Sequence, residues 1–208
     1  QQLEKTKKTR MIYWLRTLWE WIVFFVWYNK YINPSEFKKM IDPDYEHTYN
    51  YTCLPTDLDM NLHMNNAVYF TALEFARGRY GMEVGYNKYA LDNGCGFILA
   101  GNGFQYRREV GLFQTMQVKT RVMAIDDKWM YFTQSCFVKG KFVGRGVARM
   151  ALIKNRKVLG AKDVAKSIAK DDEIAEQILS KLCDPKQFDQ PQLKSFIDHQ
   201  DSIKEGAL

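Results

Sequence analysis

Residues 57–77 read DLDMNLHMNNAVYFTALEFAR and place unusual polar chemistry directly before an apolar segment. Asp59, Asn61 and His63 bring a carboxylate, an amide and an imidazole into five residues. These groups can accept, donate or transfer protons near neutral pH. The spacing therefore predicts a loop that carries chemistry, followed by a helix.

The helix is predicted to begin at Asn65 or Asn66, because a short amide side chain can accept from the free N–H groups of the first turn. It is expected to end near Gly78 to Gly81. Its apolar residues lie nearly all round, which predicts an enclosed helix; they are Ala67, Val68, Phe70, Ala72, Leu73, Phe75 and Ala76. The free N–H groups and the dipole at its start could stabilise an oxyanion.

The residues around this helix are typical of strands. Residues 47–53 alternate among β-formers before Pro55 and predict a first strand. A short second helical piece over 82–94 ends in a turn, and from Cys95 onward the period changes to two. Strands are predicted at four places, residues 96–108, 114–125, 129–139 and 142–154.

The predicted strands at 129–139 and 142–154 are joined by a hairpin connection, Lys139-Gly140-Lys141. In 114–125 the side chains alternate, so the sheet is expected to pack on one side only. One face is predicted to hold Val118, Thr120, Val122 and Ala124, and the other Lys119, Arg121 and Met123.

The motif Asp57-x-Asp59-x-Asn61-x-His63-Met-Asn65-Asn66-x-x-Tyr69, with Glu74-x-x-Arg77, resembles the signature of hotdog-fold thioesterases of the 4-hydroxybenzoyl-CoA thioesterase group. Further similarity, to membrane-anchored eukaryotic thioesterase-superfamily proteins, lies in FQYRR at 104–108, QVKTR at 117–121 and DDKWMY at 126–131. The resemblance covers about residues 47–160. It implies an α+β hotdog fold, in which an antiparallel sheet wraps a central helix.

The resemblance also implies catalytic roles. Asp59 aligns with a nucleophile or general base, Asn61 and His63 with residues that orient substrate and carboxylate, and Glu74 with a base or nucleophile in related enzymes. Each has a structural alternative. Asp59 could bond its own loop backbone, His63 could fix the turn, and Glu74 could pair with Arg77 or with an arginine of the sheet.

Substrate contacts are expected from Asn65, Asn66 and Tyr69, although the two asparagines also suit helix capping and Tyr69 also suits the core. Arg107 and Arg108 are candidates for the phosphates of coenzyme A or of a carrier protein. Ordinary solvated arginines are the alternative. Asp57 is expected to be structural.

The net charge of +6 and the pI of about 9.0 suit anionic lipid, a phosphate-rich ligand or simply a basic surface. No zinc-finger or nucleic-acid-recognition motif is present, so no nucleic-acid partner is expected. The four cysteines form no CxxC pair and the three histidines do not cluster, so no metal site is expected. No cofactor is predicted beyond the coenzyme A or carrier-protein thioester that serves as substrate.

Residues 1–46 are predicted to form a basic arm, an aromatic helix and a linker. The helix at 11–28 holds four of the five tryptophans but also Arg16 and Glu20, so it is borderline for spanning a bilayer. A short anchor, an interfacial helix and a helix docked on a protein are all open. We expect an intracellular, membrane-associated protein, with the mitochondrial inner membrane as first location and the endoplasmic reticulum as alternative.

Residues 161–208 are predicted to form a helical, charged extension, with helices at 163–170 and 171–182 and breaks at Pro185 and Pro191. Its apolar stripe suits packing on the domain or on a partner.

The leading functional hypothesis is hydrolysis of acyl thioesters by a homodimer or by a heteromeric pair of hotdog chains, since the resembled family has its pocket between subunits. The alternative is a non-catalytic hotdog subunit of a larger membrane complex, possibly mitochondrial. A dehydratase of the same fold fits less well, because those enzymes pair a histidine with a differently spaced acid.

Overall fold

The computed structural model describes residues 15, 18–19, 22, 45–169 and 171–205. The predicted aromatic helix at 11–28 falls outside this range except for Leu15, Leu18, Trp19 and Ile22, which are helical and exposed. Among the described helices, none combines the length and the apolar composition that a bilayer crossing requires.

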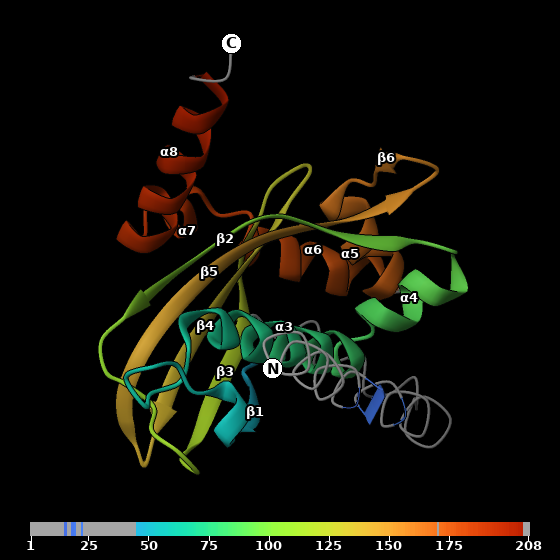
Figure 1. Cartoon of the computed structure of the whole chain (residues 1–208). Coiled ribbons are helices and arrows are strands. Elements are labelled where there is room, and N and C mark those ends of the chain that lie inside the picture. The colour runs from blue at the N-terminus through green and yellow to red at the C-terminus, as the bar shows by residue number, and fades with distance from the viewer. Residues whose placement is uncertain (1–14, 16–17, 20–21, 23–44, 170, 206–208) are drawn as a thin grey trace.

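A strongly curved antiparallel sheet forms the body of the molecule (Figure 1). Its strands agree with the predicted ones to within about two residues at each end. A short strand β6 (Lys157–Val158) pairs with the end of β5. In spatial order the other strands are β1 (His47–Thr52), β3 (Thr115–Ile125), β4 (Met130–Val138), β5 (Lys141–Lys154) and β2 (Gly96–Tyr106).

Helix α3 (Asn66–Glu83) lies in the hollow of the sheet (Figure 1), which confirms the predicted wrapped-helix arrangement. The described chain buries one face of α3 rather than enclosing it, and Glu74 is exposed on the other side. The buried positions recur at three and four residues, as expected for one helical face. They are Tyr69, Ala72, Leu73, Ala76, Arg77, Tyr80 and Gly81.

The predicted end of this helix at Gly78 to Gly81 is wrong, because α3 continues to Glu83. Both glycines contact the next helix, α4 (Tyr86–Asp92). The Asn87 side chain donates from Nδ2 to the Gly78 carbonyl over 3.1 Å, and its Oδ1 occupies the space that a Cβ at residue 81 would need. Packing between the helices, not helix termination, therefore accounts for glycine at residue 81.

The predicted alternation in β3 fails at its far end. A β-bulge between Val122 and Ala124 shifts the register against β4, so Ala124 leaves the face of Val122 and joins Met123 on the outer side of the sheet. An extra residue in one strand reverses the faces that follow. The outer side is consequently apolar here and needs a cover.

The last two helices provide that cover, so the expectation of a sheet packed on one side only is wrong. The turn helix α7 (Pro185–Phe188) and α8 (Pro191–Glu205) lie on the face opposite α3 (Figure 1), where Leu193 is fully buried. Pro185 and Pro191 begin these helices, because proline suits a first turn whose N–H has no partner.

Two earlier helices, α5 (Ala161–Ala169) and α6 (Asp172–Leu182), confirm the predicted helical segments after the sheet. They pack on the inner side, in one apolar cluster with Tyr80 and Val84 of α3 and with α4. The inner core thus continues through residue 182.

Candidate active site

The loop before α3 is organised around the Asp59 carboxylate. Its Oδ1 accepts from the backbone N–H groups of Asn61, at 2.8 Å, and His63, at 3.4 Å. The Asp59 N–H donates to the His63 carbonyl over 2.9 Å, and Leu62 adopts a φ of 62° at the tip. A branched residue in this left-handed region is uncommon, and the side-chain bonds of Asp59 offset part of its cost.

Asp57 stabilises the same loop through hydrogen bonds to its backbone. It is buried, its Oδ2 accepts from the Leu54 N–H at 2.8 Å, and its carbonyl accepts from the Asn65 N–H at 2.8 Å. These bonds agree with the structural role predicted for Asp57.

His63 faces the neighbouring loop, and its contacts there are to protein groups. Its Nε2 lies 3.1 Å from Oε2 of Glu109, with both side chains partly exposed. Its backbone forms a bridge with Gly111. Asn61 is exposed on the same loop. The imidazole is therefore positioned by the 107–114 loop.

The start of α3 is capped as predicted. Asn65 accepts from the Ala67 N–H at 2.9 Å, and the Asn66 carbonyl accepts from the Tyr106 hydroxyl at 3.1 Å. Asn66 is exposed beside this cap. The capping bond occupies one of the N–H groups that would otherwise be available to an oxyanion.

The remaining predicted substrate contacts have different positions. Tyr69 is buried against the rings of Phe104 and Tyr106, and burial raises the pKa of its hydroxyl well above the usual value. Arg107 and Arg108 are both exposed, and Arg108 also donates to the Phe142 carbonyl over 2.7 Å. Tyr69 is thus part of the core, whereas both arginines are exposed.

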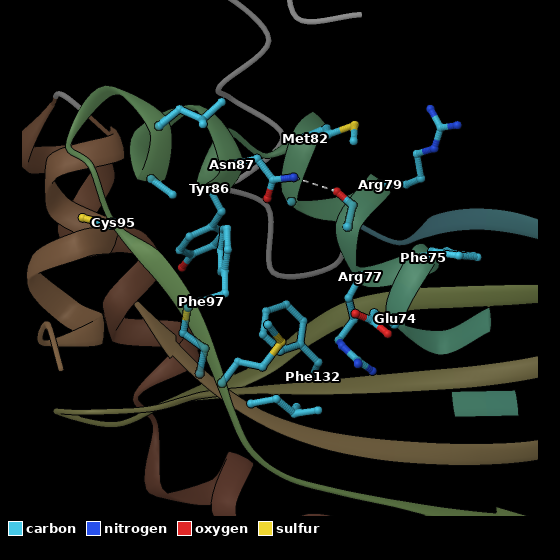
Figure 2. Close-up of a pocket in the computed structure, with 17 residues that line it drawn as sticks. Glu74, Phe75, Arg77, Arg79, Met82, Tyr86, Asn87, Cys95, Phe97 and Phe132 are labelled. Atoms are coloured by element: carbon cyan, nitrogen blue, oxygen red, sulfur yellow. Dashed lines mark hydrogen bonds between the residues drawn. The ribbon is translucent and has the colours of Figure 1, made fainter. Parts of the chain in front are cut away.

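A cavity of about 560 Å³ lies farther along α3, between this helix, α4 and strands β2, β4 and β5 (Figure 2). Of the predicted site residues it includes Glu74 alone; Asp59, Asn61 and His63 are not among the residues that line it. Glu74 lies eight positions after Asn66 along the helix, a rise of about 12 Å. The structure therefore divides the predicted catalytic residues between two places.

Glu74 and Arg77 stand together at one end of this cavity (Figure 2). Glu74 is exposed, while Arg77 is buried and donates from Nη1 to the Gln134 Oε1 over 2.6 Å. Burial lowers the pKa of Arg77 to about 10, and the nearby Glu74 carboxylate opposes that shift. The predicted pairing of Glu74 with Arg77 is present as charge proximity, while the direct hydrogen bond of Arg77 goes to Gln134.

Gln134, which is buried in the centre of β4, was not among the residues predicted from the sequence. Its Nε2 donates to the Leu73 carbonyl at 2.8 Å and to the Thr120 hydroxyl at 3.0 Å. The signal was available, because Gln134 shares a strand face with Phe132 and Cys136, and a glutamine on a buried face needs polar partners. This network holds the buried guanidinium at the cavity.

Among the described residues, no group of three or more His, Cys, Asp and Glu side chains is arranged to hold a metal ion. The chemistry available at the cavity is that of a carboxylate beside a cation and an apolar wall.

The sequence of this chain matches a known protein family. The sequence model of the thioesterase-like superfamily matches residues 53–182. Protein THEM6 of Xenopus laevis is 36% identical over 89 residues, which are 43% of this chain and 43% of that protein. Protein THEM6 of Drosophila melanogaster is 30% identical over 97 residues, covering 46% of this chain and 50% of that protein. The matches thus span half or less of these curated relatives.

Solved structures resemble the fold. YbaW, a probable thioesterase from Escherichia coli, aligns with a TM-score of 0.53 at 19% identity, over 65% of this chain and 98% of that one. The protein SAV2348 from Staphylococcus aureus, solved in complex with CoA, aligns with a TM-score of 0.55 at 15% identity, over 64% and 85%. At these identities the likeness establishes the fold alone, which is the predicted hotdog arrangement.

Proposed function

Since the chain belongs to the thioesterase-like superfamily, we propose that it hydrolyses acyl thioesters with Glu74 as the reacting carboxylate. The observation that carries this assignment is the position of Glu74, exposed at one end of a largely apolar cavity and beside the buried Arg77.

Thioester hydrolysis needs a carboxylate that either attacks the carbonyl carbon or removes a proton from water. Either role requires an ionised, accessible group. The Arg77 guanidinium lies close to Glu74, and it stays in place through its bond to Gln134. An acyl group could lie along the apolar walls, with its thioester carbonyl at the Glu74 end.

Asp59 is the rival carboxylate. Its Oδ1 is engaged by two amides of its own loop, which supports a positioning role within one chain. In a two-chain site the same loop would approach from the second copy, and Asp59, Asn61 and His63 would then contact the substrate. The start of α3, with Asn65 and Asn66, would lie beside them.

A second copy is proposed to pair along strand β2, an edge of the sheet. Three apolar side chains on this strand, Phe97, Leu99 and Tyr106, are each at least 39% exposed. Edge strands with exposed apolar residues are ready to pair with another chain. Such a dimer would cover the open side of the cavity, because Phe97 and Leu99 line it.

The acyl group would be carried by coenzyme A or by a carrier protein, whose phosphates need cations. Arg107 and Arg108, both exposed, are the candidates. Membrane attachment through residues 11–28, at the mitochondrial inner membrane or the endoplasmic reticulum, belongs to the same proposal. Fractionation of cells expressing the full chain would test it, and recovery in the soluble fraction would contradict it.

Hydrolysis of acyl-CoA and acyl-carrier-protein substrates by the purified chain tests the catalytic assignment. We expect Glu74→Gln to lower kcat/KM by about 100-fold or more, with an unchanged melting temperature because the side chain is exposed. Asp59→Asn keeps an oxygen acceptor for the loop, so it separates chemistry from structure. Loss of activity only in Asp59→Asn would transfer the reacting role to Asp59.

The second candidate function is a non-catalytic hotdog subunit of a membrane complex. The internal bonds of Asp59 favour it, because they give the motif loop a purely structural purpose. Absence of hydrolysis with both carriers, in a folded wild-type protein, would favour this function over the enzyme.

A further inference from the structure

Gly78 is an unfavourable residue for its position in a helix. It lies in the interior of α3, where glycine weakens a helix by its backbone freedom. Its φ is not positive, so the backbone conformation does not require glycine. Its contact with Asn87 uses the main-chain carbonyl, which any residue would supply. The missing side chain therefore needs another explanation.

The surroundings of Gly78 supply it. A Cβ built on this residue would have no neighbour within 4 Å, and Gly78 lines the cavity. Gly81, one turn away, differs because the Asn87 side chain already fills its space. The open volume beside α3 thus exists in part because residue 78 has no side chain.

The position of Gly78 along α3 gives this volume a direction. Glu74, Gly78 and Met82 are spaced four residues apart, so they follow one line along the helix, and all three border the cavity. From Glu74 to Met82 the helix rises about 12 Å. An extended chain advances about 1.2 Å per backbone bond, so this length suits about ten carbon atoms.

The walls along this line are mostly apolar. Strand β2 contributes Phe97 and Leu99, β4 contributes Met130 and Phe132, and β5 contributes Met150. Beyond Glu74 the helix itself adds Met82. Methionine side chains adapt to irregular shapes, which suits a flexible hydrocarbon better than a rigid aromatic acid with polar substituents.

We propose that this cavity holds the hydrocarbon tail of a fatty acyl thioester, and that the absent side chain at Gly78 sets the longest tail it accepts. The inference rests on the proposed function, because it places the thioester at Glu74 and the tail past residue 78 toward α4. Residue 78 is a specificity-determining position and has no part in the bond-breaking step.

The experiment compares wild type, Gly78→Ala and Gly78→Leu with butyryl-, decanoyl- and hexadecanoyl-CoA. The leucine side chain would occupy the middle of the cavity. We expect kcat/KM for decanoyl-CoA to fall by about tenfold or more in Gly78→Leu, and by less in Gly78→Ala. Hexadecanoyl-CoA, whose tail is longer than the line from Glu74 to Met82, should be a poor substrate of all three proteins. The butyryl value is expected to stay within about threefold. An unchanged ratio of long to short substrates would overturn the inference while leaving the hydrolase proposal intact.

A binding arm separates the two proposals. Displacement of a fluorescent fatty acid by decanoate measures occupancy of the cavity without any reaction. Binding by wild type that is lost in Gly78→Leu, with no hydrolysis in either, would support the cavity assignment and contradict the enzyme. No binding and no hydrolysis of long chains by wild type would overturn the inference. Gln177→Leu, an exposed change in α6, is the matched control and should behave as wild type.

Discussion

The motif loop at residues 54–66 and the cavity beside α3 use polar groups in opposite ways. In the loop, the side-chain oxygens of Asp57, Asp59 and Asn65 accept hydrogen bonds from backbone N–H groups of nearby residues. At the cavity, Glu74 is exposed and Arg77 bonds across to the sheet. The stretch richest in polar residues is therefore the loop that uses them for its own hydrogen bonds. The space for a ligand lies elsewhere, between α3, α4 and the sheet.

The largest expected contrast between the two regions is in thiol reactivity. Cys95 lines the cavity and is partly exposed, whereas Cys53, below the motif loop, is fully buried. In a Cys183→Ser background, we expect Cys95 to react with a maleimide about 1,000-fold faster than Cys53, whose reaction requires opening of the core. Mass spectrometry of timed samples measures both rates.

Cys136 provides the control, because burial raises the pKa of its thiol to about 12 and it should react as slowly as Cys53. Decanoate should slow the reaction of Cys95 if it enters the cavity. Equal reactivity of Cys95 and Cys53 would contradict the distinction between an open cavity and a closed loop.

The next effect is on stability, through Gln134. Replacing Gln134 with leucine leaves the buried Arg77 guanidinium and the Leu73 carbonyl without their partner, and we expect a loss of about 3 kcal/mol in the free energy of unfolding. Urea denaturation measures it. Gln105→Leu, an exposed change in β2, should alter stability by about 0.5 kcal/mol at most. Similar values for both variants would show that the network does not hold the cavity together.

A smaller effect is expected in the motif loop. Asp59→Ala removes the acceptor of the Asn61 and His63 N–H groups and should cost about 1–2 kcal/mol, because Leu62 then keeps a positive φ with less support. Asp59→Asn retains an oxygen there and should cost less. Thermal melts of the two variants give the comparison, and a greater loss in the asparagine variant would argue against the loop role.

The smallest effect is expected at the helix cap. Asn65→Ala removes the acceptor of the Ala67 N–H and should destabilise the protein by about 1 kcal/mol. Asn65→Asp keeps an acceptor at the cap and adds a charge that suits the helix start, so its stability should stay near that of wild type. Chemical denaturation distinguishes them; equal losses would show that the cap is dispensable.

Much of the fold was predictable because it follows from local periodicity. The two-residue period after Cys95 predicted β2 to β5, and the asparagines before Ala67 predicted the start of α3. The failures have one cause in common. The end of α3, the far end of β3 and the covering of the outer face by α7 and α8 depend on what packs against each segment, and a neighbour distant in sequence leaves no local signal.

The candidate site divides along the same line. The motif predicted which residues carry acid, base and amide groups, and Glu74 was among them. It left open whether Asp59 would bond its own loop, and it did not indicate that Glu74 borders a cavity. That separation arises from the helical rise between Asn66 and Glu74.

The sequence by itself determined the antiparallel strands, the helix start and the resemblance to thioesterases, because residue type, period and capping act over a few neighbours. Only the tertiary structure decided that Gly78 opens a cavity, that Gln134 holds Arg77 and that α8 covers the outer face of the sheet. Those outcomes depend on side chains brought together from separate elements, where the volume left unfilled and the partners of buried groups are properties of the packed chain.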